Sequence, residues 1–424
     1  MHDLRMVREQ MDVLRDGLRR RGRLDALAPV LERIETLDRE RRAAIQAVEE
    51  RKAERNAVSQ EVARLKRAKE SADAQMERGR LLGEAIARGE RDLADAEGAL
   101  RALLYELPNV TLPEVPEGDE EQNVIVRGWG EPRDPGGVRP HWEIASKLGI
   151  IDLERAAKVS GSGFVFYRGE GARLVRALMG FFLDLQGREH GYEEIWAPAL
   201  VNRASMTGTG QLPKFEDDAY AIAGDDLFLI PTAEVPVTNL YRDELLDGAR
   251  LPMAFTAYTP CFRREAGSAG KDTRGILRTH QFDKVELVRY VAPEASADQL
   301  ELLTSHAESA LQRLGLPYRV KLLAAGDTGF SSAKTYDLEV WAPGVGSWLE
   351  VSSCSNFGDF QARRANIRYR PAAGEKPRFV HTLNGSGLAF PRTIAAILEH
   401  YQREDGGVTV PEALRPYFGA GQIG

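Results

Sequence analysis

The residue types best suited to chemistry gather on two predicted strands, 254–265 and 281–291. Side chains alternate between the two faces of a strand. One face of each strand should therefore carry a mixed polar and aromatic set: Cys261, Arg263 and Glu265 on the first, and Phe282, Lys284 and Glu286 on the second. A guanidinium suits a phosphate, an aromatic ring suits a purine, and a carboxylate can accept from an amine. The pattern favours a site for a charged, planar ligand, and a solvent-facing strand pair is the alternative.

The connection between these strands, residues 266–275, is rich in glycine and contains the pair Gly270-Lys271. A phosphate-binding P-loop needs a glycine five residues before that pair and a serine or threonine directly after it. Glu265 and Asp272 occupy those places, so the sequence excludes a P-loop. We expect a basic loop that could close over a phosphate or an RNA end.

A third predicted strand, 347–356, should place Trp348, Glu350 and Ser352 on one face. Glu350 with the hydroxyls of Ser352 and Ser353 offers the hard oxygen donors that Mg²⁺ prefers. Alone, this signal is weak.

Arg392 follows Pro391 at the start of a predicted helix that continues through Ile394, Ile397 and Leu398. Proline is typical of a first helical turn, and a helix N-terminus attracts anions. The sequence therefore predicts a second phosphate contact at Arg392, with a merely surface-exposed arginine as the alternative.

The elements that must position these residues divide the chain in two. Residues 108–140 are rich in Pro, Gly and Glu, which indicates a linker or domain entry. Beyond it, strands come in adjacent pairs, a pattern that favours an antiparallel sheet flanked by helices, an α+β fold. We expect an N-terminal domain over 1–110 and a second domain over 111–424.

Between Pro29 and Pro108 the sequence predicts two long helices that bury their apolar stripes against each other as an antiparallel hairpin. The heptad positions are Ile34, Leu37, Ala44, Val48, Val58, Val62 and Leu65 on the first helix, and Leu82, Ile86, Leu93, Ala96, Leu100, Leu103 and Leu107 on the second. Arg41, Arg51 and Arg55 interrupt the first stripe, and Ser71 and Asp73 are candidate caps in the polar link.

The outer part of this predicted arm is basic. Its cations outnumber Glu54 and Glu61: Arg51, Lys52, Arg55, Arg64, Lys66, Arg67 and Lys69. A phosphate-contacting surface and an ordinary solvated helix face both fit this composition.

Composition limits the remaining possibilities. The chain has 424 residues and a net charge of −7, which by itself argues weakly against a nucleic-acid partner. Its two cysteines, Cys261 and Cys354, cannot form a disulfide framework and lack metal-ligand spacing, so we expect reduced thiols and no zinc. No apolar run is long enough to span a bilayer, and the N-terminus lacks a secretory core. We expect a cytoplasmic protein with no membrane partner.

Taken together, the motifs closely resemble the class II aminoacyl-tRNA synthetases, and within them the bacterial seryl-tRNA synthetases. The resemblance covers nearly the whole chain. The segments GYEEIWAP at 191–198, FRREAGSAGKDTRG at 262–275 with HQFDKVE at 280–286, and NGSGLAFPR at 384–392 are similar to the three class II motifs. PTAE at 231–234 and SSCSNFGDFQARR at 352–364 are similar to the seryl subgroup. Phe390 and Pro391 replace smaller residues found in many relatives, but the arginine is kept.

The resemblance implies a class II antiparallel β-sheet flanked by helices, with an N-terminal two-helix coiled-coil arm that binds tRNA. It also implies roles for individual residues. Arg263 would hold the α-phosphate, Arg392 the γ-phosphate, and Glu350 would act with them in catalysis. The implied ATP-binding residues are Arg263, Arg264, Glu265, Phe282, Glu350, Val351, Ser352, Ser353 and Arg392. The implied serine-binding residues are Thr232, Ala233, Glu234, Glu286 and Ser386. Glu350 and Ser353 would hold Mg²⁺ with ATP.

The implied function is that of a serine–tRNA ligase, which forms seryl-adenylate and transfers serine to the 3′-terminal adenosine of tRNA(Ser), with tRNA(Sec) as a further candidate substrate. The implied assembly is a homodimer in which the arm of one subunit reaches tRNA bound to the other. Two alternatives remain open: a paralogue that activates an amino acid without charging tRNA, and a non-enzymatic coiled-coil RNA-binding or scaffold protein.

Overall fold

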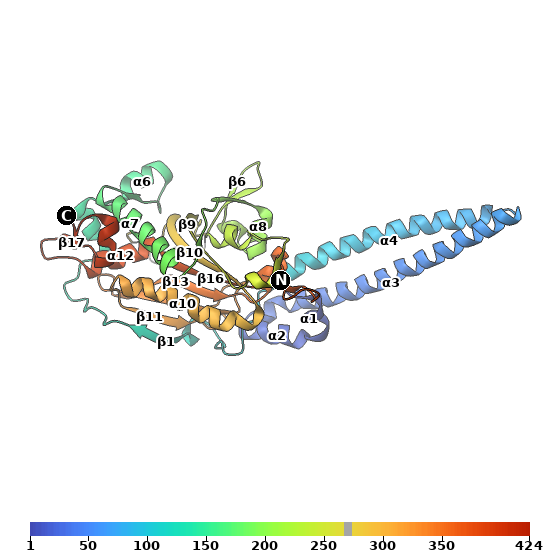
Figure 1. Cartoon of the computed structure of the whole chain (residues 1–424), viewed down its shortest axis with the longest axis horizontal. Helices are drawn as coiled ribbons and strands as arrows, with labels where there is room; N and C mark the ends of the chain where they lie inside the picture. Colours follow the sequence, from blue (N-terminus) through green and yellow to red (C-terminus); the bar gives the residue numbers. More distant parts are fainter. Residues whose placement is uncertain (267–273) are drawn as a thin grey trace. The chain divides into compact units, whose positions relative to one another are not determined.

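The computed structural model describes residues 1–266 and 274–424 and divides into two compact units (Figure 1). Residues 1–19 and 23–108 form an N-terminal unit, and residues 20–22 and 109–424 form a larger unit. Most of the predicted loop 266–275, with Gly270 and Lys271, lies outside the described residues.

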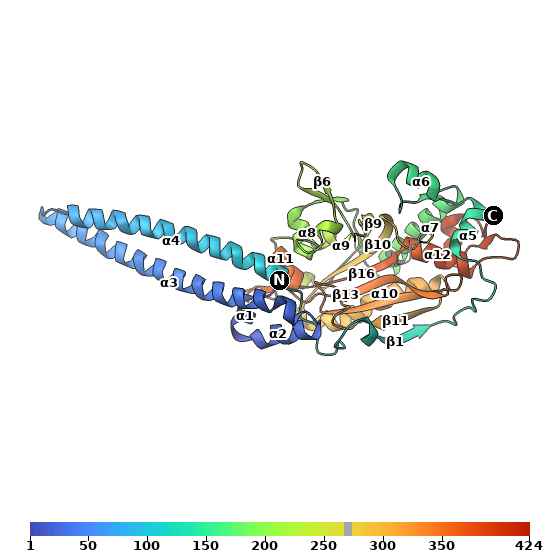
Figure 2. The ribbon, with the colours of Figure 1, turned by 180° about the vertical axis from the view of Figure 1, so that it is seen from behind.

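The N-terminal unit contains the predicted hairpin of long helices, α3 (Leu24–Ala68) and α4 (Asp73–Glu106), which run side by side in both views (Figures 1 and 2). Two shorter helices that the sequence analysis missed precede it, α1 (Leu4–Glu9) and α2 (Met11–Arg20). The expected start at Pro29 is wrong, because α3 begins at Leu24. Pro29 is the sixth residue of α3 and lies inside the helix, where a proline removes one backbone hydrogen bond.

Apolar side chains hold the hairpin together along the predicted stripe. Ile34, Val48 and Ile86 are buried, whereas Leu104 is buried in place of the predicted Leu103. Gly89 lets the helices approach closely, since a Cβ there would lie 2.8 Å from Val48 Cγ2.

Polar groups complete the hairpin at its seam and at its turn. Arg41, which interrupts the stripe, pairs with Glu97 of the opposite helix at 2.9 Å. In the link, the Ser71 hydroxyl accepts from the Asp73 backbone N–H at 3.4 Å, but the N-cap residue of α4 is Ala72, so neither of the two predicted cap residues occupies that position. The predicted two-helix arm is confirmed.

The larger unit is built on an eight-stranded sheet in which every neighbouring pair is antiparallel except β4 and β9. This confirms the predicted α+β class. In sheet order the strands are β1 (Val124–Trp129), β11 (Tyr318–Leu322), β12 (Lys334–Ala342), β13 (Ser347–Asn356), β16 (His381–Ala389), β10 (Gln281–Val291), β9 (Met253–Phe262) and β4 (Glu193–Glu194). The region 108–140 is more than a linker, because it contributes the edge strand β1.

Three helices pack their apolar faces on this sheet: α7 (Glu170–Asp184), α10 (Ser296–Arg313) and α12 (Phe390–His400). Leu174, Leu303 and Ile394 from these helices share one core with Val285 and Leu287 of β10. Alternation then turns Lys284 and Glu286 to the opposite face of the same strand. That face carries the polar side chains considered below.

Shorter elements surround the sheet. The remaining helices are α5 (His141–Leu148), α6 (Leu153–Ser160), α8 (Arg203–Thr209), α9 (Glu234–Thr238), α11 (Phe360–Ala365) and α13 (Arg415–Phe418). The remaining strands are β2 (Ile151–Asp152), β3 (Phe166–Tyr167), β5 (Leu200–Asn202), β6 (Tyr220–Ile222), β7 (Leu227–Leu229), β8 (Leu245–Asp247), β14 (Arg368–Arg370), β15 (Arg378–Phe379), β17 (Val408–Thr409) and β18 (Gln422–Ile423). Single turns of 3-10 or π helix are η1 (Glu120–Gln122), η2 (Leu185–Glu189), η3 (Glu216–Asp218), η4 (Gly248–Arg250), η5 (Pro293–Ala295) and η6 (Glu412–Leu414). Among the described residues, no helix combines the length and apolar character needed to cross a membrane.

Candidate active site

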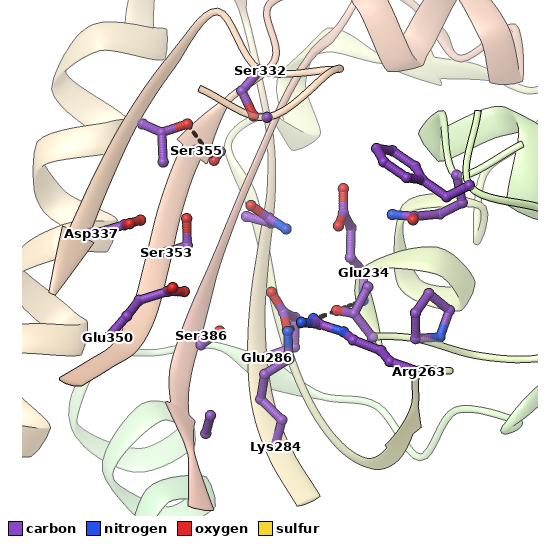
Figure 3. A pocket seen from close by; sticks show the side chains of 18 of the residues that line it. Glu234, Arg263, Lys284, Glu286, Ser332, Asp337, Glu350, Ser353, Ser355 and Ser386 are labelled. Atoms are coloured by element: carbon purple, nitrogen blue, oxygen red, sulfur yellow. Dashed lines mark hydrogen bonds and ion pairs between the residues drawn. The ribbon is translucent and has the colours of Figure 1, made fainter. Parts of the chain in front are cut away.

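A polar cavity of about 590 Å³ opens on the sheet face opposite the helices, lined by β10, β12, β13 and β16 (Figure 3). The start of α12 and the segments 209–218, 231–234, 263–265, 277–279 and 323–332 also contribute to its wall. The cavity collects most of the residues that the sequence analysis singled out: Thr232, Glu234, Arg263, Glu265, Phe282, Glu286, Glu350, Val351, Ser353, Ser386 and Arg392.

Three of the predicted site residues do not line this cavity. Arg264 is exposed, and Ala233 is fully buried in an apolar cluster behind the wall. Ser352 is buried and donates its hydroxyl to the Ser386 carbonyl at 2.7 Å. At these three positions, the residues next to them in the sequence line the cavity, and the predicted residues themselves do not.

Arg263 and Phe282 face each other where β9 ends and β10 begins. The Arg263 guanidinium carbon lies 5.1 Å from the centre of the Phe282 ring. The predicted strand to residue 265 is wrong in its last part, because β9 ends at Phe262. Glu265 adopts a left-handed φ of 54° and forms an ion pair with Arg278. The chain thus leaves the sheet just before Arg263 and Glu265. The turn that follows the strand, and not strand alternation, orients both side chains towards the cavity.

A buried charged cluster occupies one side of the cavity. Lys284 forms an ion pair with Glu286, and its ammonium donates to the Thr232 hydroxyl at 2.9 Å. That hydroxyl donates in turn to Glu286 Oε2 at 3.0 Å. Glu286 Oε1 is buried and has no hydrogen-bond partner among the described residues. Burying an unpaired carboxylate oxygen is costly, so this atom is a strong candidate for a ligand contact.

Glu234 lies near this cluster and is held by Gln361, whose amide donates to Glu234 Oε1 at 2.6 Å. Burial and the negative charge of Glu286 raise the pKa of Glu234 to about 7, while the Gln361 hydrogen bond and the Lys284 charge oppose that rise. Figure 3 shows Glu234 and Glu286 directed into the same space. The pocket therefore holds a carboxyl group that titrates near neutral pH.

On the other side of the cavity, a β-bulge brings Glu350 and Ser353 to the same face. The pairing of β12 with β13 places Glu339 opposite Glu350 and Leu338 opposite Ser352, so Val351 is an extra residue. The bulge shifts the alternation by one. The predicted shared face of Glu350 and Ser352 is therefore wrong, and Ser353 takes the place of Ser352 beside Glu350.

Asp337 of β12 stands opposite Ser353 and was missed by the sequence analysis. Burial and the negative charge of Glu350 hold the pKa of Asp337 well above its usual range. Its Oδ1 has no hydrogen-bond partner among the described residues. Glu350, Ser353 and Asp337 form a group of oxygen donors with excess negative charge, shown together in Figure 3. Alternation of Thr335, Asp337 and Glu339 with Tyr336, Leu338 and Val340 was the signal that could have identified this strand.

Arg392 enters the cavity from the first turn of α12, where Pro391 takes the predicted early position. Its guanidinium donates to the backbone carbonyls of Leu277 at 3.1 Å and Glu350 at 2.8 Å. The Glu350 carboxylate lies 3.7 Å from the same guanidinium. These contacts hold the guanidinium of Arg392 at the N-terminus of α12 and beside the Glu350 carboxylate of β13.

The cavity thus combines guanidiniums on two sides, an aromatic ring, a cluster of oxygen donors and a buried carboxylate pair. Arg278 and Asn384 also line it, although the sequence analysis assigned them no role. Such an arrangement can hold a polyphosphate with a planar base and a small ligand that carries hydrogen-bond donors.

Comparison with known proteins agrees with this geometry. The seryl-tRNA synthetase N-terminal domain model matches residues 1–111, and the model of the tRNA synthetase class II core domain (G, H, P, S and T) matches residues 214–401. The serine–tRNA ligases of Gemmatimonas aurantiaca and Geobacillus kaustophilus are 66% and 57% identical to the chain, each over 99% of both sequences.

Solved structures extend the likeness to three dimensions. The seryl-tRNA synthetase of Pyrococcus horikoshii, complexed with ATP, matches with a TM-score of 0.94 at 38% identity, covering 100% of this chain and 99% of that one. The cytoplasmic serine–tRNA ligase of Naegleria fowleri, in complex with AMP, matches with a TM-score of 0.88 at 29% identity, covering 100% and 98%. The chain belongs to the serine–tRNA ligase family of class II aminoacyl-tRNA synthetases.

Proposed function

We propose that the chain activates L-serine with ATP to form seryl-adenylate and then transfers serine to the 3′-terminal adenosine of tRNA(Ser). Family membership and the cavity geometry support this reaction. tRNA(Sec) remains a further candidate substrate. A paralogue that does not charge tRNA is less well supported, because the chain carries the N-terminal domain of the family as well as the core.

The observation that carries the proposal is the buried, unpartnered Oε1 of Glu286. Lys284 and Thr232 hold the other carboxylate oxygen, which fixes the orientation of the group. Serine brings a hydroxyl and an ammonium, both of which can donate to this atom. Alanine would leave the same oxygen unpaired, and sites built around a substrate hydroxyl reject the analogue that lacks it by about 10⁴-fold.

The remaining serine contacts follow from the same side of the cavity. Glu234, when ionised, complements the serine ammonium, and Thr232 and Ser386 line the space beside it. Ala233 supports this wall from behind. Threonine is excluded by size, since the extra methyl would have to enter a wall of packed polar groups.

The ATP side of the cavity has a cation for each end of the triphosphate. Arg263 would hold the α-phosphate while its neighbour Phe282 stacks on adenine, and Arg392 would hold the γ-phosphate. Glu265 would accept from the adenine amino group, for which its ion pair with Arg278 must open or be shared. Arg264, Val351 and Ser352 would contribute to ATP binding through the backbone around them.

Glu350 and Ser353, joined by Asp337, fit a magnesium ion bound with ATP. All three offer hard oxygen atoms, and Asp337 Oδ1 is buried without a hydrogen-bond partner among the described residues. When bound, Mg²⁺ would neutralise phosphate oxygens and draw the triphosphate into one conformation.

The reaction then depends on positioning and charge. The serine carboxylate, held in line with the α-phosphorus, attacks it, and pyrophosphate leaves. Arg263 stabilises the charge that builds on the α-phosphate oxygens. In the second step a ribose hydroxyl of the tRNA end attacks the seryl carbonyl carbon, and AMP leaves. No covalent bond to the enzyme forms.

The domain and assembly assignments belong to the same proposal. Residues 1–110 would bind tRNA through the basic end of the arm, and residues 111–424 would carry catalysis. A homodimer is part of this assignment, and Trp196, whose side chain is 76% exposed, is one residue that a partner subunit would cover. Reduced, buried Cys261 and Cys354 fit a cytoplasmic enzyme.

Serine-dependent exchange of pyrophosphate into ATP tests the proposal. The parent protein should catalyse exchange with serine but not with alanine. Glu286→Gln removes the charge and disturbs the fixed acceptor, so kcat/KM for serine should fall by about 10²- to 10³-fold. ATP binding measured by calorimetry is the control for an intact fold and should stay within about twofold. Undiminished exchange by this variant would remove Glu286 from the serine pocket, and absence of exchange by the parent would overturn the function.

A further inference from the structure

The link between α2 and α3 contains a buried arginine, Arg21, which belongs to the larger unit. Residues 20–22 group with the larger unit, although the residues on both sides belong to the N-terminal unit. Arg21 is only 6% exposed. A long cationic side chain is rarely buried to this extent without a dense set of acceptors.

Most of the acceptors of Arg21 lie in one short stretch of backbone. Its guanidinium donates to the carbonyls of Thr328 at 2.9 Å and Ser332 at 2.6 Å, with longer bonds to Ala325 and Gly329. Its Nε donates to the Asn109 carbonyl at 2.8 Å. Because every one of these acceptors is a main-chain carbonyl, the guanidinium fixes the path of residues 325–332, here named the wall segment.

The wall segment is part of the cavity, since Asp327, Gly329, Phe330, Ser331 and Ser332 all line it. Figure 3 shows Ser332 at the rim of the same space that holds Glu234 and Glu286. The shape of this wall therefore depends on a residue outside the continuous catalytic sequence.

Hydrogen bonds continue from the wall segment towards Glu234. The Ser331 hydroxyl donates to the Thr209 carbonyl at 3.0 Å. The Gln361 amide donates to the same carbonyl at 3.2 Å and to Glu234 Oε1 at 2.6 Å. Gly210 permits this approach, because a Cβ there would lie 2.1 Å from Ser331 Oγ.

We propose that Arg21 is a positioning residue for the serine pocket, acting through the wall segment, Thr209 and Gln361 on the Glu234 carboxylate. It touches no substrate. Its effect should appear in serine recognition more than in ATP binding, because Arg263 and Arg392 are held by other parts of the chain. The inference rests on the proposed serine activation and adds a residue to it.

Arg20 provides a matched control. It is the preceding arginine and also donates to backbone carbonyls, those of Thr111, Leu112, Pro113 and Val115. None of these four residues lines the cavity. Arg20 and Arg21 thus fix two different stretches of backbone in the same way, and only one of the stretches belongs to the pocket.

The test compares Arg21→Lys with Arg20→Lys in full-length protein, by serine-dependent exchange and thermal unfolding. Lysine keeps the charge but cannot reach several carbonyls with a planar fork. Arg21→Lys should raise KM for serine by about tenfold and KM for ATP by less than about twofold, whereas Arg20→Lys should change both by less than about twofold. Ser331→Ala, which spares the buried arginine, should raise KM for serine in the same direction by about threefold.

A second readout separates positioning from loss of stability. The Gln361 hydrogen bond favours ionised Glu234, so loosening it should move the midpoint of the pH profile of kcat/KM for serine upward in Arg21→Lys. The other charged groups around Glu234 are Glu286, Lys284 and Arg263, and none of them changes in this variant. Equal changes in the two arginine variants, or a lowered melting temperature with unchanged KM and midpoint, would overturn the inference. An inactive parent would refute the proposed function instead.

Discussion

Glu234 and Glu286 bring two carboxylates into one pocket, and their surroundings separate their behaviour. Lys284 lies against Glu286, whereas the first partner of Glu234 is the neutral amide of Gln361. Burial and repulsion from Glu286 then raise the pKa of Glu234 to about 7. In the proposed reaction the arriving serine ammonium supplies the positive charge that Glu234 lacks, so ligand binding and ionisation of Glu234 should be coupled.

This coupling predicts a pH dependence for serine recognition. Only ionised Glu234 complements the ammonium, and the ionised fraction falls as the pH drops below about 7. Below that value kcat/KM for serine should decrease about tenfold per pH unit, and above it the profile should level off. The measurement is the exchange reaction at fixed saturating ATP between pH 5.5 and 8.5.

Glu234→Gln serves as the control for this profile. The variant should lose activity and also lose the acidic limb assigned to Glu234, because the amide does not titrate. If the variant retained the same limb with its midpoint near pH 7, another group would be responsible for it.

Predictability at the residue scale depended on whether the local backbone was regular. Phe282 and Glu286 lie on the regular strand β10, so alternation alone assigned them to one face. Ser352 was assigned to the wrong face, because the bulge at Val351 depends on the register between β12 and β13. A single strand sequence does not contain its partner's register. Asp337 was missed for a related reason: its neighbourhood arises only when the strands pair.

At the scale of elements, the helical arm is the feature that the sequence predicted best. Heptad spacing is a local property, so the hairpin followed directly from it. The boundaries followed less well, since α3 passes through Pro29 and the short helices α1 and α2 carry too few periodic positions to stand out. The role of the basic residues on the arm requires an experiment, because the fold is the same whether or not they contact tRNA.

Neutralising four of the unpaired cations of the arm tests its proposed role in tRNA binding. Arg55, Lys66, Arg67 and Lys69 have no ion pair with a described residue, whereas Arg64 is paired with Glu61. Changing those four cations to Gln should raise KM for tRNA by about 10- to 100-fold and reduce the salt dependence of binding by about three counterions. Serine-dependent exchange without tRNA should be unchanged.

The matched control keeps the charge at the same positions, with Arg55→Lys, Lys66→Arg, Arg67→Lys and Lys69→Arg. Since phosphate attraction depends mainly on charge, this variant should charge tRNA within about threefold of the parent. Normal charging by the neutralised variant would show that its arm cations are only a solvated helix face.

At the scale of the molecule, the chain divides into a helical unit and a sheet-based unit, and residues 20–22 group with the sheet-based unit. Strand pairing, helical periodicity and linker composition predicted the α+β class and the presence of an arm. Long-range contacts were beyond reach, because Arg21 and its acceptors in the wall segment lie 304 to 311 positions apart in sequence. Nothing in the residues around Arg21 distinguishes it from Arg20, and only the folded chain separates their partners.

The central claim for the whole molecule is that ATP and serine meet on the open face of the antiparallel sheet. The most direct measurement is a crystal structure of the protein with ATP, Mg²⁺ and serinamide, which lacks the attacking carboxylate. The account predicts adenine on Phe282, the α-phosphate at Arg263, the γ-phosphate at Arg392 and the serinamide hydroxyl or ammonium at Glu286 Oε1. A nucleotide bound elsewhere, or both guanidiniums turned away from its phosphates, would contradict it.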